Sequence, residues 1–196
     1  MEEIEYKFMI SRDEFDYLLK MQPFKSSVKQ VNHYFIDRDN LLRLNHITVR
    51  VREYPDKKML EIKYPRRNIH QKFYTKNENL AIRDEYSRKI QNFSEIQPDE
   101  IVAVTGIQIN DIQCVGHMTT YRYVYYPYKN VKVCLDFNEY LGMYDYELEI
   151  EFKSEDFLDI DEILSNFDIN PDLQHHGGKC TRFLQALKRS NVNEEK

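Results

Sequence analysis

Charged and apolar residues alternate one by one along much of this chain, and this alternation constrains its fold more than any other feature. Successive side chains of a β-strand point to opposite faces of a sheet, so a repeat of two residues indicates a strand with one apolar face. We therefore predict an α+β, mainly β fold, in which an eight-stranded antiparallel sheet forms a closed or nearly closed barrel with flanking helices. The predicted strands are residues 2–10, 31–36, 47–53, 59–64, 81–90, 119–128, 131–138 and 144–153.

A few segments follow a helical repeat instead. Ser11 and Glu14 have the spacing of a capping box, in which the two side chains satisfy the first free amides of a helix. A glycine pair at Gly177 and Gly178 precedes the last apolar segment with helical spacing. The predicted helices are residues 12–21, 98–104, 159–167 and 179–188.

The composition is that of an ordered globular domain. The chain has 196 residues, of which 41% are hydrophobic and only 5 are glycine and 6 proline, so disordered and low-complexity classes are excluded. No change of composition marks a linker, and we expect a single domain over residues 1–190 with a loose polar tail over residues 191–196. The net charge of −5 argues against general nucleic-acid binding, while it allows a local basic pocket.

The sequence shows neither a membrane segment nor a secretion signal. No apolar run approaches the roughly 20 residues of a membrane helix, and the initial methionine is followed by two glutamates rather than by a basic and an apolar segment. We therefore expect a cytoplasmic protein without a membrane partner. The 3 cysteines lie far apart, which favours free thiols over a disulfide framework or a zinc site. Nothing in the sequence indicates an oligomeric state.

Charges are sorted by sign on the predicted strands. Glu147, Glu149 and Glu151 alternate with apolar residues, so three like charges share one face at intervals of about 7 Å. Arg50 and Arg52 share a face of another strand in the same way. Such faces are either the solvent side of a half-covered sheet or the walls of a barrel lumen. An ordinary surface intersperses both signs, so a shared cation beside the glutamates remains an open interpretation.

A charged lumen would suit one kind of ligand. Carboxylates on one wall can bind a hard divalent cation, and arginines and lysines on another wall can bind phosphate oxygens. A metal-bound polyphosphate would satisfy both walls.

Glu3, Glu5 and Lys7 form a Glu-x-Glu-x-Lys motif at the N-terminus, and further short motifs follow in a fixed order. Together they resemble the motifs of the CYTH superfamily, the triphosphate tunnel metalloenzymes, which includes inorganic and thiamine triphosphatases and class IV adenylate cyclases. The resemblance extends over residues 2–188. The other motifs that carry it are Tyr34-Phe35-Ile36-Asp37, Val49-Arg50-Val51-Arg52, Leu60-Glu61-Ile62-Lys63, Arg83-Asp84-Glu85-Tyr86, Thr120-Tyr121-Arg122, Val133-Cys134-Leu135-Asp136, residues 146–151 and Gly178-Lys179-Cys180-Thr181-Arg182.

The resemblance implies a triphosphate tunnel that binds a linear triphosphate with Mg²⁺ or Mn²⁺ and hydrolyses it. The substrate would be inorganic tripolyphosphate or a small organic triphosphate such as thiamine triphosphate. Lys63 or Arg52 would stabilise the leaving diphosphate, and Glu149 would act through the metal. The implied metal ligands are Glu3, Glu5, Glu147, Glu149 and Glu151, with the choice among the last three left open. The implied phosphate-binding residues are Lys7, Arg50, Arg52, Lys63, Arg122, Lys179 and Arg182.

Two other functions remain compatible with these residues. A class IV-type adenylate cyclase would use the same charges but would also need to recognise a base, and no motif for that is present. A binding or sensor module would hold a polyphosphate or nucleotide without turning it over. Tyrosines within residues 121–128 are expected to pack in the sheet rather than stack on a base, and His175 and His176 are expected in a loop over one tunnel mouth.

Overall fold

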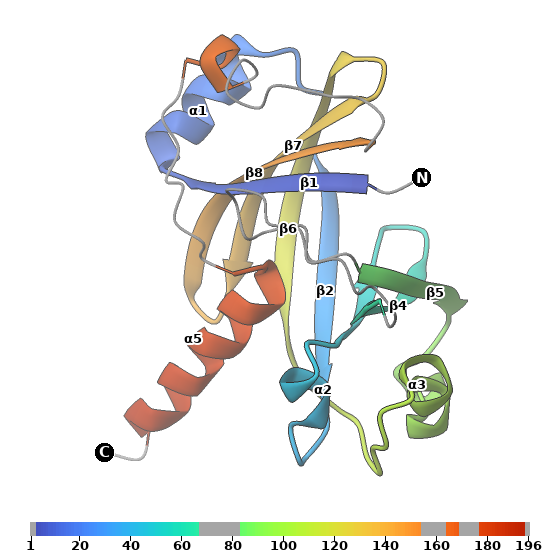
Figure 1. The fold of residues 1–196 in the computed structure, drawn as a ribbon. Coiled ribbons are helices and arrows are strands. Elements are labelled where there is room, and N and C mark those ends of the chain that lie inside the picture. Colours follow the sequence, from blue (N-terminus) through green and yellow to red (C-terminus); the bar gives the residue numbers. More distant parts are fainter. Residues whose placement is uncertain (1–2, 67–82, 154–163, 169–176, 195–196) are drawn as a thin grey trace. The chain divides into compact units, whose positions relative to one another are not determined.

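A computed structural model describes residues 3–66, 83–153, 164–168 and 177–194 of the chain (Figure 1). The fold is mainly β, with eight strands in one sheet of order β1-β8-β7-β6-β2-β3-β4-β5. This confirms the predicted eight-stranded antiparallel architecture. The order has two ends, β1 and β5, so hydrogen bonds between the described strands leave the sheet open rather than closing it. The strands are β1 (Glu3–Ile10), β2 (Val28–Ile36), β3 (Thr48–Glu53), β4 (Lys58–Pro65), β5 (Arg83–Ile90), β6 (Gln113–Tyr128), β7 (Val131–Tyr140) and β8 (Met143–Lys153).

The strand predictions match closely, except at the starts of two strands. β6 begins at Gln113 rather than at residue 119, and β2 begins at Val28 rather than at residue 31. The first part of β6 carries Gly116 with φ 136°, a backbone conformation that strand-forming side chains avoid. Pairing with neighbouring strands therefore extends β6 through a segment whose own residues do not favour a strand.

Helix α1 (Arg12–Met21) has the predicted bounds and the predicted capping box. The Ser11 hydroxyl accepts a hydrogen bond from the Glu14 amide at 3.2 Å, and the Glu14 carboxylate accepts one from the Ser11 amide at 2.7 Å. Helix α3 (Pro98–Thr105) lies where the short helix was predicted.

Helix α5 (Lys179–Glu194) differs from its prediction at the C-terminal end. The prediction ended it at residue 188 and left residues 191–196 as a loose tail, whereas the helix continues to Glu194. The added residues include Ser190, Asn191 and Asn193, which have low helix propensity, so the local sequence does not explain this extension.

Two short elements were missed. Helix α2 (Leu41–Leu44) and the 3-10 helix η1 (Phe93–Glu95) are each about one turn long, too short for a repeat to show in the sequence. Asp37 accepts hydrogen bonds from the amides of Leu41 and Leu42 at 2.7 and 2.9 Å, so this motif residue caps α2.

Several predictions fall wholly or partly outside the described residues, including residue 2 of the first predicted strand and residues 195–196 of the predicted tail. The predicted helix over residues 159–167 is described only from residue 164, where residues 164–166 are helical. The start of the predicted strand over residues 81–90 and the loop at His175 and His176 lie outside the described part. None of the described helices is long and apolar enough to span a membrane.

Contacts divide the chain into two compact units: unit 1 contains residues 1–28 and 120–177, and unit 2 contains residues 29–119 and 178–196. In unit 1, α1 and the segment of residues 164–168 pack on the apolar face of the strands, and Figure 1 shows this segment in orange beside α1. Leu18, Leu148 and Ile150 are fully buried in its core. The core of unit 1 thus fixes one face of β1, β7 and β8.

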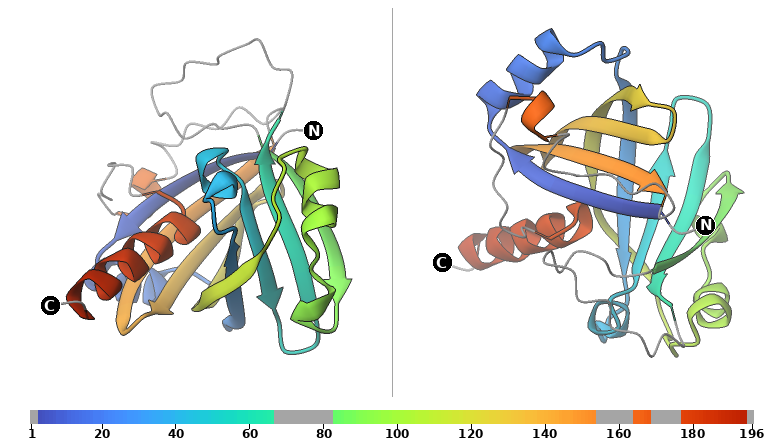
Figure 2. Two further views of the ribbon diagram at one scale, coloured as in Figure 1. Left: turned by 90° about the horizontal axis from the view of Figure 1, so that it is seen from below. Right: turned by 45° about the horizontal axis from the view of Figure 1, so that its top comes forward.

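Unit 2 has its own apolar core. Val51, Leu60 and Ile62 on β3 and β4 are fully buried, together with Ile101 of α3. Figure 2 shows α3, in green, beside β5 in both views. Arg88 of β5 donates a hydrogen bond to Glu100 of α3 at 2.7 Å, which ties this helix to the edge of the unit 2 strands. The opposite face of these strands is free to carry charged side chains.

Candidate active site

The charged face of unit 1 is formed by β1, β7 and β8 in register. Glu5 lies opposite Glu151, and Lys7 lies opposite Glu149. On the other side of β8, Asp136 of β7 lies opposite Glu147. We call this surface the unit 1 polar face; its described charged residues are Glu5, Lys7, Arg122, Lys132, Asp136, Asp145, Glu147, Glu149 and Glu151.

The centre of this polar face is buried rather than solvated. Glu147 and Asp136 are 0% exposed and Glu149 is 5% exposed, although Leu148 and Ile150 between them already fill the core on the other side. Lysines and carboxylates are almost never fully buried without partners. The solvent-face interpretation of these alternating charges is therefore wrong for the central strand of unit 1.

The carboxylates converge in two overlapping groups. Oxygens of Glu5, Glu149 and Glu151 lie within 4.8 Å of one another, and so do oxygens of Asp136, Glu147 and Glu149. Glu149 belongs to both groups. Several carboxylate oxygens around one point are the ligand set that Mg²⁺ and other hard divalent cations prefer, so these residues fit a divalent metal.

The electrostatics of the group formed by Glu5, Glu149 and Glu151 also favour a bound cation. Burial, followed by the neighbouring Glu149, raises the pKa of Glu5 to about 7. Burial and then Glu149 also raise the pKa of Glu151. Like charges held together in a low-dielectric environment disfavour full ionisation. A divalent cation among these oxygens would favour the ionised form.

Arg122 of β6 lies among the carboxylates of unit 1. Its Nη2 is 2.7 Å from Asp136 Oδ2 and 2.8 Å from Glu149 Oε2, and its Nε donates to Asp136 Oδ1 at 2.8 Å. Burial alone would lower the pKa of Arg122, but Glu149 and Asp136 together raise it well above its usual value. This guanidinium thus partly neutralises the second carboxylate group.

Two lysines complete the unit 1 polar face. Lys7 Nζ lies 2.6 Å from Glu5 Oε2, and Lys132 Nζ lies 2.6 Å from Glu151 Oε2. Both side chains are about one third exposed, at 37% and 33%. They are therefore more easily drawn to another anion than Arg122 is.

In unit 2, the cations gather on the face of β3 and β4 that points away from the apolar core. Arg50 donates from Nε to Glu61 Oε2 at 2.7 Å, and Arg52 donates from Nε to Asn32 Oδ1 at 3.0 Å. Lys63 lies 3.2 Å from Glu85 of β5. We call this surface the unit 2 polar face; its described charged residues are Arg50, Arg52, Glu61, Lys63, Glu85 and Lys89.

Helix α5 brings the last two predicted phosphate-binding residues, Lys179 and Arg182, into unit 2. Its Phe183 is fully buried, with its ring centroid 5.0 Å from that of Tyr34 on β2. A Cβ at Gly116 would lie only 2.8 Å from the Phe183 ring. The absence of a side chain at Gly116 therefore allows the first turn of α5 to approach β6 closely. Arg182 in this turn is itself buried, at 8% exposure.

The structure thus groups the predicted site residues within each unit. Glu5, Glu149 and Glu151 meet in unit 1, with Glu147 in the overlapping second group. Arg50, Arg52 and Lys63 share one face in unit 2. Glu3 belongs to β1, and its side chain lies outside the described part of the structure.

Sequence reasoning overlooked some partners of these residues. Asp136 was not among the predicted metal ligands, although its place on the charged side of an alternating strand could have indicated it. Glu61 and Glu85 bind predicted phosphate-binding cations. Tyr123 and Tyr125 pack against the unit 1 core, as predicted for tyrosines of this segment.

Comparison with known proteins identifies the family. A family model described as CYTH domain matches residues 1–182. No curated protein matches the chain. Among solved structures, a candidate adenylate cyclase from Bacillus halodurans is 25% identical, with a TM-score of 0.70 over 93% of this chain and 99% of that chain.

Two further solved structures share the fold. A candidate adenylyl cyclase from Hippeastrum, described as having a dominant triphosphatase activity, is 20% identical with a TM-score of 0.70 over 94% of this chain and 96% of that chain. A Pyrococcus horikoshii protein is 17% identical with a TM-score of 0.57 over 86% of this chain and 92% of that chain. With its motifs, its strand order and a family-model match over residues 1–182, the chain belongs to the CYTH domain family.

Proposed function

We propose that this protein hydrolyses a linear triphosphate in a reaction that depends on a divalent metal. The observation that carries the proposal is the convergence of Glu5, Glu149 and Glu151 within 4.8 Å on a buried face of unit 1. A structural role does not require like charges to lie this close together, because each disfavours the ionisation of the others even though Lys7, Arg122 and Lys132 pair with them. Membership of the CYTH family supports the same function.

Mg²⁺ or Mn²⁺ would be held by Glu5, Glu149 and Glu151, with Glu147 and Glu3 as further candidate ligands. When bound, the metal would offset charge on the phosphate oxygens and orient a water for in-line attack. Water would attack the terminal phosphorus as the bond to the bridging oxygen breaks, giving orthophosphate and diphosphate. Glu149 contributes to both carboxylate groups, so it is the ligand whose loss should cost most.

Cations would bind the rest of the substrate. Arg50, Arg52 and Lys63 would contact the phosphates, with Lys63 and Arg52 stabilising the leaving diphosphate. Lys7, Lys179, Arg122 and Arg182 are further candidates. Arg50 and Lys63 already lie against Glu61 and Glu85, so the carboxylates orient these side chains before the substrate arrives.

A substitution of Glu149 tests the metal assignment. Glu149→Gln keeps the shape of the side chain but removes a charged ligand, so metal-dependent release of phosphate from tripolyphosphate should fall at least ~100-fold. Glu139→Gln is the matched control, because Glu139 is an exposed residue of β7. Unchanged turnover in Glu149→Gln, or full activity in excess chelator, would contradict the assignment.

A substrate panel separates the proposed activity from its two alternatives. Phosphate release would be measured with tripolyphosphate, thiamine triphosphate, ATP and GTP, with cyclic AMP measured in parallel. Both the Bacillus halodurans and the Hippeastrum proteins bear the name of a cyclase, and the Hippeastrum protein is described as having a dominant triphosphatase activity, so both products must be followed. Cyclic AMP as the main product would favour the cyclase. Tight tripolyphosphate binding without turnover of any substrate would favour the sensor.

A further inference from the structure

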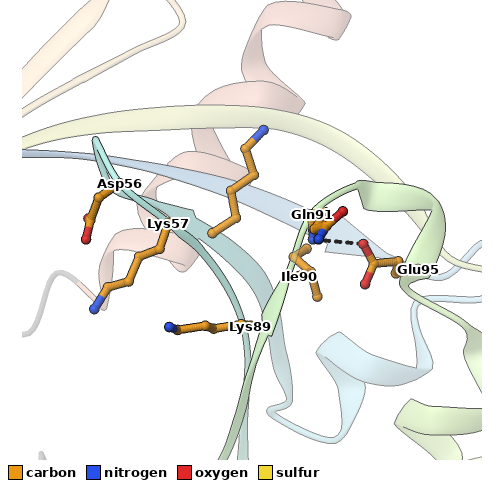
Figure 3. A pocket seen from close by; sticks show the side chains of 7 residues that line it. Asp56, Lys57, Lys89, Ile90, Gln91 and Glu95 are labelled. Atoms are coloured by element: carbon orange, nitrogen blue, oxygen red, sulfur yellow. Dashed lines mark hydrogen bonds between the residues drawn. The ribbon is translucent and has the colours of Figure 1, made fainter.

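A pocket of about 460 Å³ in unit 2 is lined by none of the residues proposed above to bind the metal or the triphosphate (Figure 3). It is formed where β4 begins and β5 ends, at the pair Lys58 and Ile90, next to the turn between β3 and β4. Three of its lining residues are lysines, Lys57, Lys58 and Lys89, and two are acidic, Asp56 and Glu95. An anion is therefore the natural ligand to consider.

Glu95 does not compete for the lysines. Its Oε1 accepts hydrogen bonds from the amides of Gln91 and Asn92, each at 2.8 Å, and Figure 3 draws the first of these. Its Oε2 lies 3.6 Å from Arg88 Nη1. These backbone hydrogen bonds lower the pKa of Glu95 and keep it ionised. The carboxylate is thus engaged in holding the loop after β5.

The lysines are less completely paired. Lys58 lies 3.5 Å from Glu53, whereas Lys57 lies over the ring of Tyr54 at 5.1 Å and has no carboxylate within ion-pair distance among the described residues. Lys89 likewise has no carboxylate of the described residues within ion-pair distance. In Figure 3 the ends of Lys57 and Lys89 extend toward the same side of the pocket. Two exposed ammonium groups are therefore available to one ligand.

The strand register places Lys89 on the unit 2 polar face. Arg52 lies opposite Met59, and Met59 lies opposite Lys89, so the three residues share one face. Two strand spacings separate Arg52 from Lys89, which is about 9 to 10 Å between their Cα atoms. The pocket thus adjoins the row of cations that would bind the phosphates of the substrate.

We propose that this pocket binds the additional phosphates of a linear inorganic polyphosphate with more than three phosphate groups. The inference rests on the proposed function, in which Arg50, Arg52 and Lys63 bind phosphates. A longer chain continues with negative charge beyond these residues, and Lys57 and Lys89 meet it as flexible point charges. A nucleoside or thiamine group in this place would leave both lysines without a partner.

The test compares chain lengths in a double variant. Lys57→Met with Lys89→Met removes both charges, and Lys20→Met with Lys129→Met removes two exposed charges of unit 1 as the matched control. Dissociation constants for tripolyphosphate, a longer polyphosphate of defined length and ATP would be measured by calorimetry at fixed salt. Equal unfolding midpoints would show that the variants fold.

The wild type and the control should bind the longer polyphosphate more tightly than tripolyphosphate. In the double variant, the dissociation constant for the longer polyphosphate should rise by about 10-fold, which removes the preference. The dissociation constants for tripolyphosphate and ATP should change little. An undiminished preference in the double variant, or no preference in the wild type, overturns the pocket assignment alone. Failure of the wild type to bind either phosphate chain overturns the proposed function together with it.

Discussion

Arg122 joins more carboxylates than any other described cation of unit 1. It contacts Asp136 and Glu149, and its Nη1 lies 3.9 Å from Glu151. Arg122→Met leaves Asp136 and Glu149 buried without this partner, so we expect the free energy of unfolding to fall by about 3–5 kcal/mol in metal-free buffer. Urea denaturation measures this change. Adding Asp136→Asn should restore part of the loss, and a single variant as stable as the wild type would show that the pairing contributes little.

Leu141 shows the opposite kind of residue effect, in which the native side chain is unfavourable. Tyr140 pairs with Met143, so Leu141 and Gly142 form the tip of the β7–β8 hairpin, with φ values of 49° and 74°. Two-residue turns with positive φ at both positions favour Asn-Gly, and leucine is strained there. Because Leu141 is also 41% exposed, Leu141→Asn should raise the free energy of unfolding by about 1 kcal/mol. A lower unfolding midpoint than that of the wild type would contradict this.

At the scale of elements, α5 depends on its contact with β6. Gly116→Ala would place a Cβ 2.8 Å from the buried Phe183 ring and would strain a backbone with φ 136°. We expect a loss of roughly 2–3 kcal/mol in unfolding free energy and weaker tripolyphosphate binding, because Lys179 and Arg182 move with this helix. Calorimetric binding and thermal unfolding measure the two effects. Gly106→Ala is the control for a glycine with positive φ away from α5, where binding should stay unchanged.

The sequence predicted those elements whose residues alternate strongly or carry a cap. Strand β8 and helix α1 could be predicted because their signals are local in sequence. These signals are the alternation of apolar and charged residues in β8 and the Ser11–Glu14 capping box of α1. The start of β6 and the one-turn helix α2 are stabilised by tertiary contacts and by Asp37, which no local pattern reveals. The charges of the candidate site were predictable from strand parity. Their mutual pairing was not, because it depends on the register between strands.

At the scale of the whole molecule, each unit carries an excess of one sign on its polar face. Among the described side chains, carboxylates outnumber cations on the unit 1 polar face, and cations outnumber carboxylates on the unit 2 polar face. Buried like charges oppose folding unless a ligand compensates them. A metal should therefore stabilise the chain as well as support its reaction.

We expect Mg²⁺ or Mn²⁺ to raise the free energy of unfolding of the whole chain, by about 2.7 kcal/mol at a concentration of 100 times the dissociation constant. Thermal unfolding with added metal and with chelator measures this. The effect should be larger at pH 8 than at pH 6, because burial and Glu149 raise the pKa of Glu5 to about 7 and a proton then competes with the metal.

The same raised pKa of Glu5 determines how the free energy of unfolding changes with pH in the absence of metal. Folded protein binds the Glu5 proton more tightly than unfolded protein does, so the contribution of this proton to stability is present at low pH and disappears as the pH rises through about 7. Glu5→Gln should flatten this part of the curve and also weaken the stabilisation by metal, whereas Glu139→Gln should change neither. A chain whose unfolding midpoint is the same with Mg²⁺, with Mn²⁺ and with chelator at pH 8 would show that the carboxylates of unit 1 do not form a metal site.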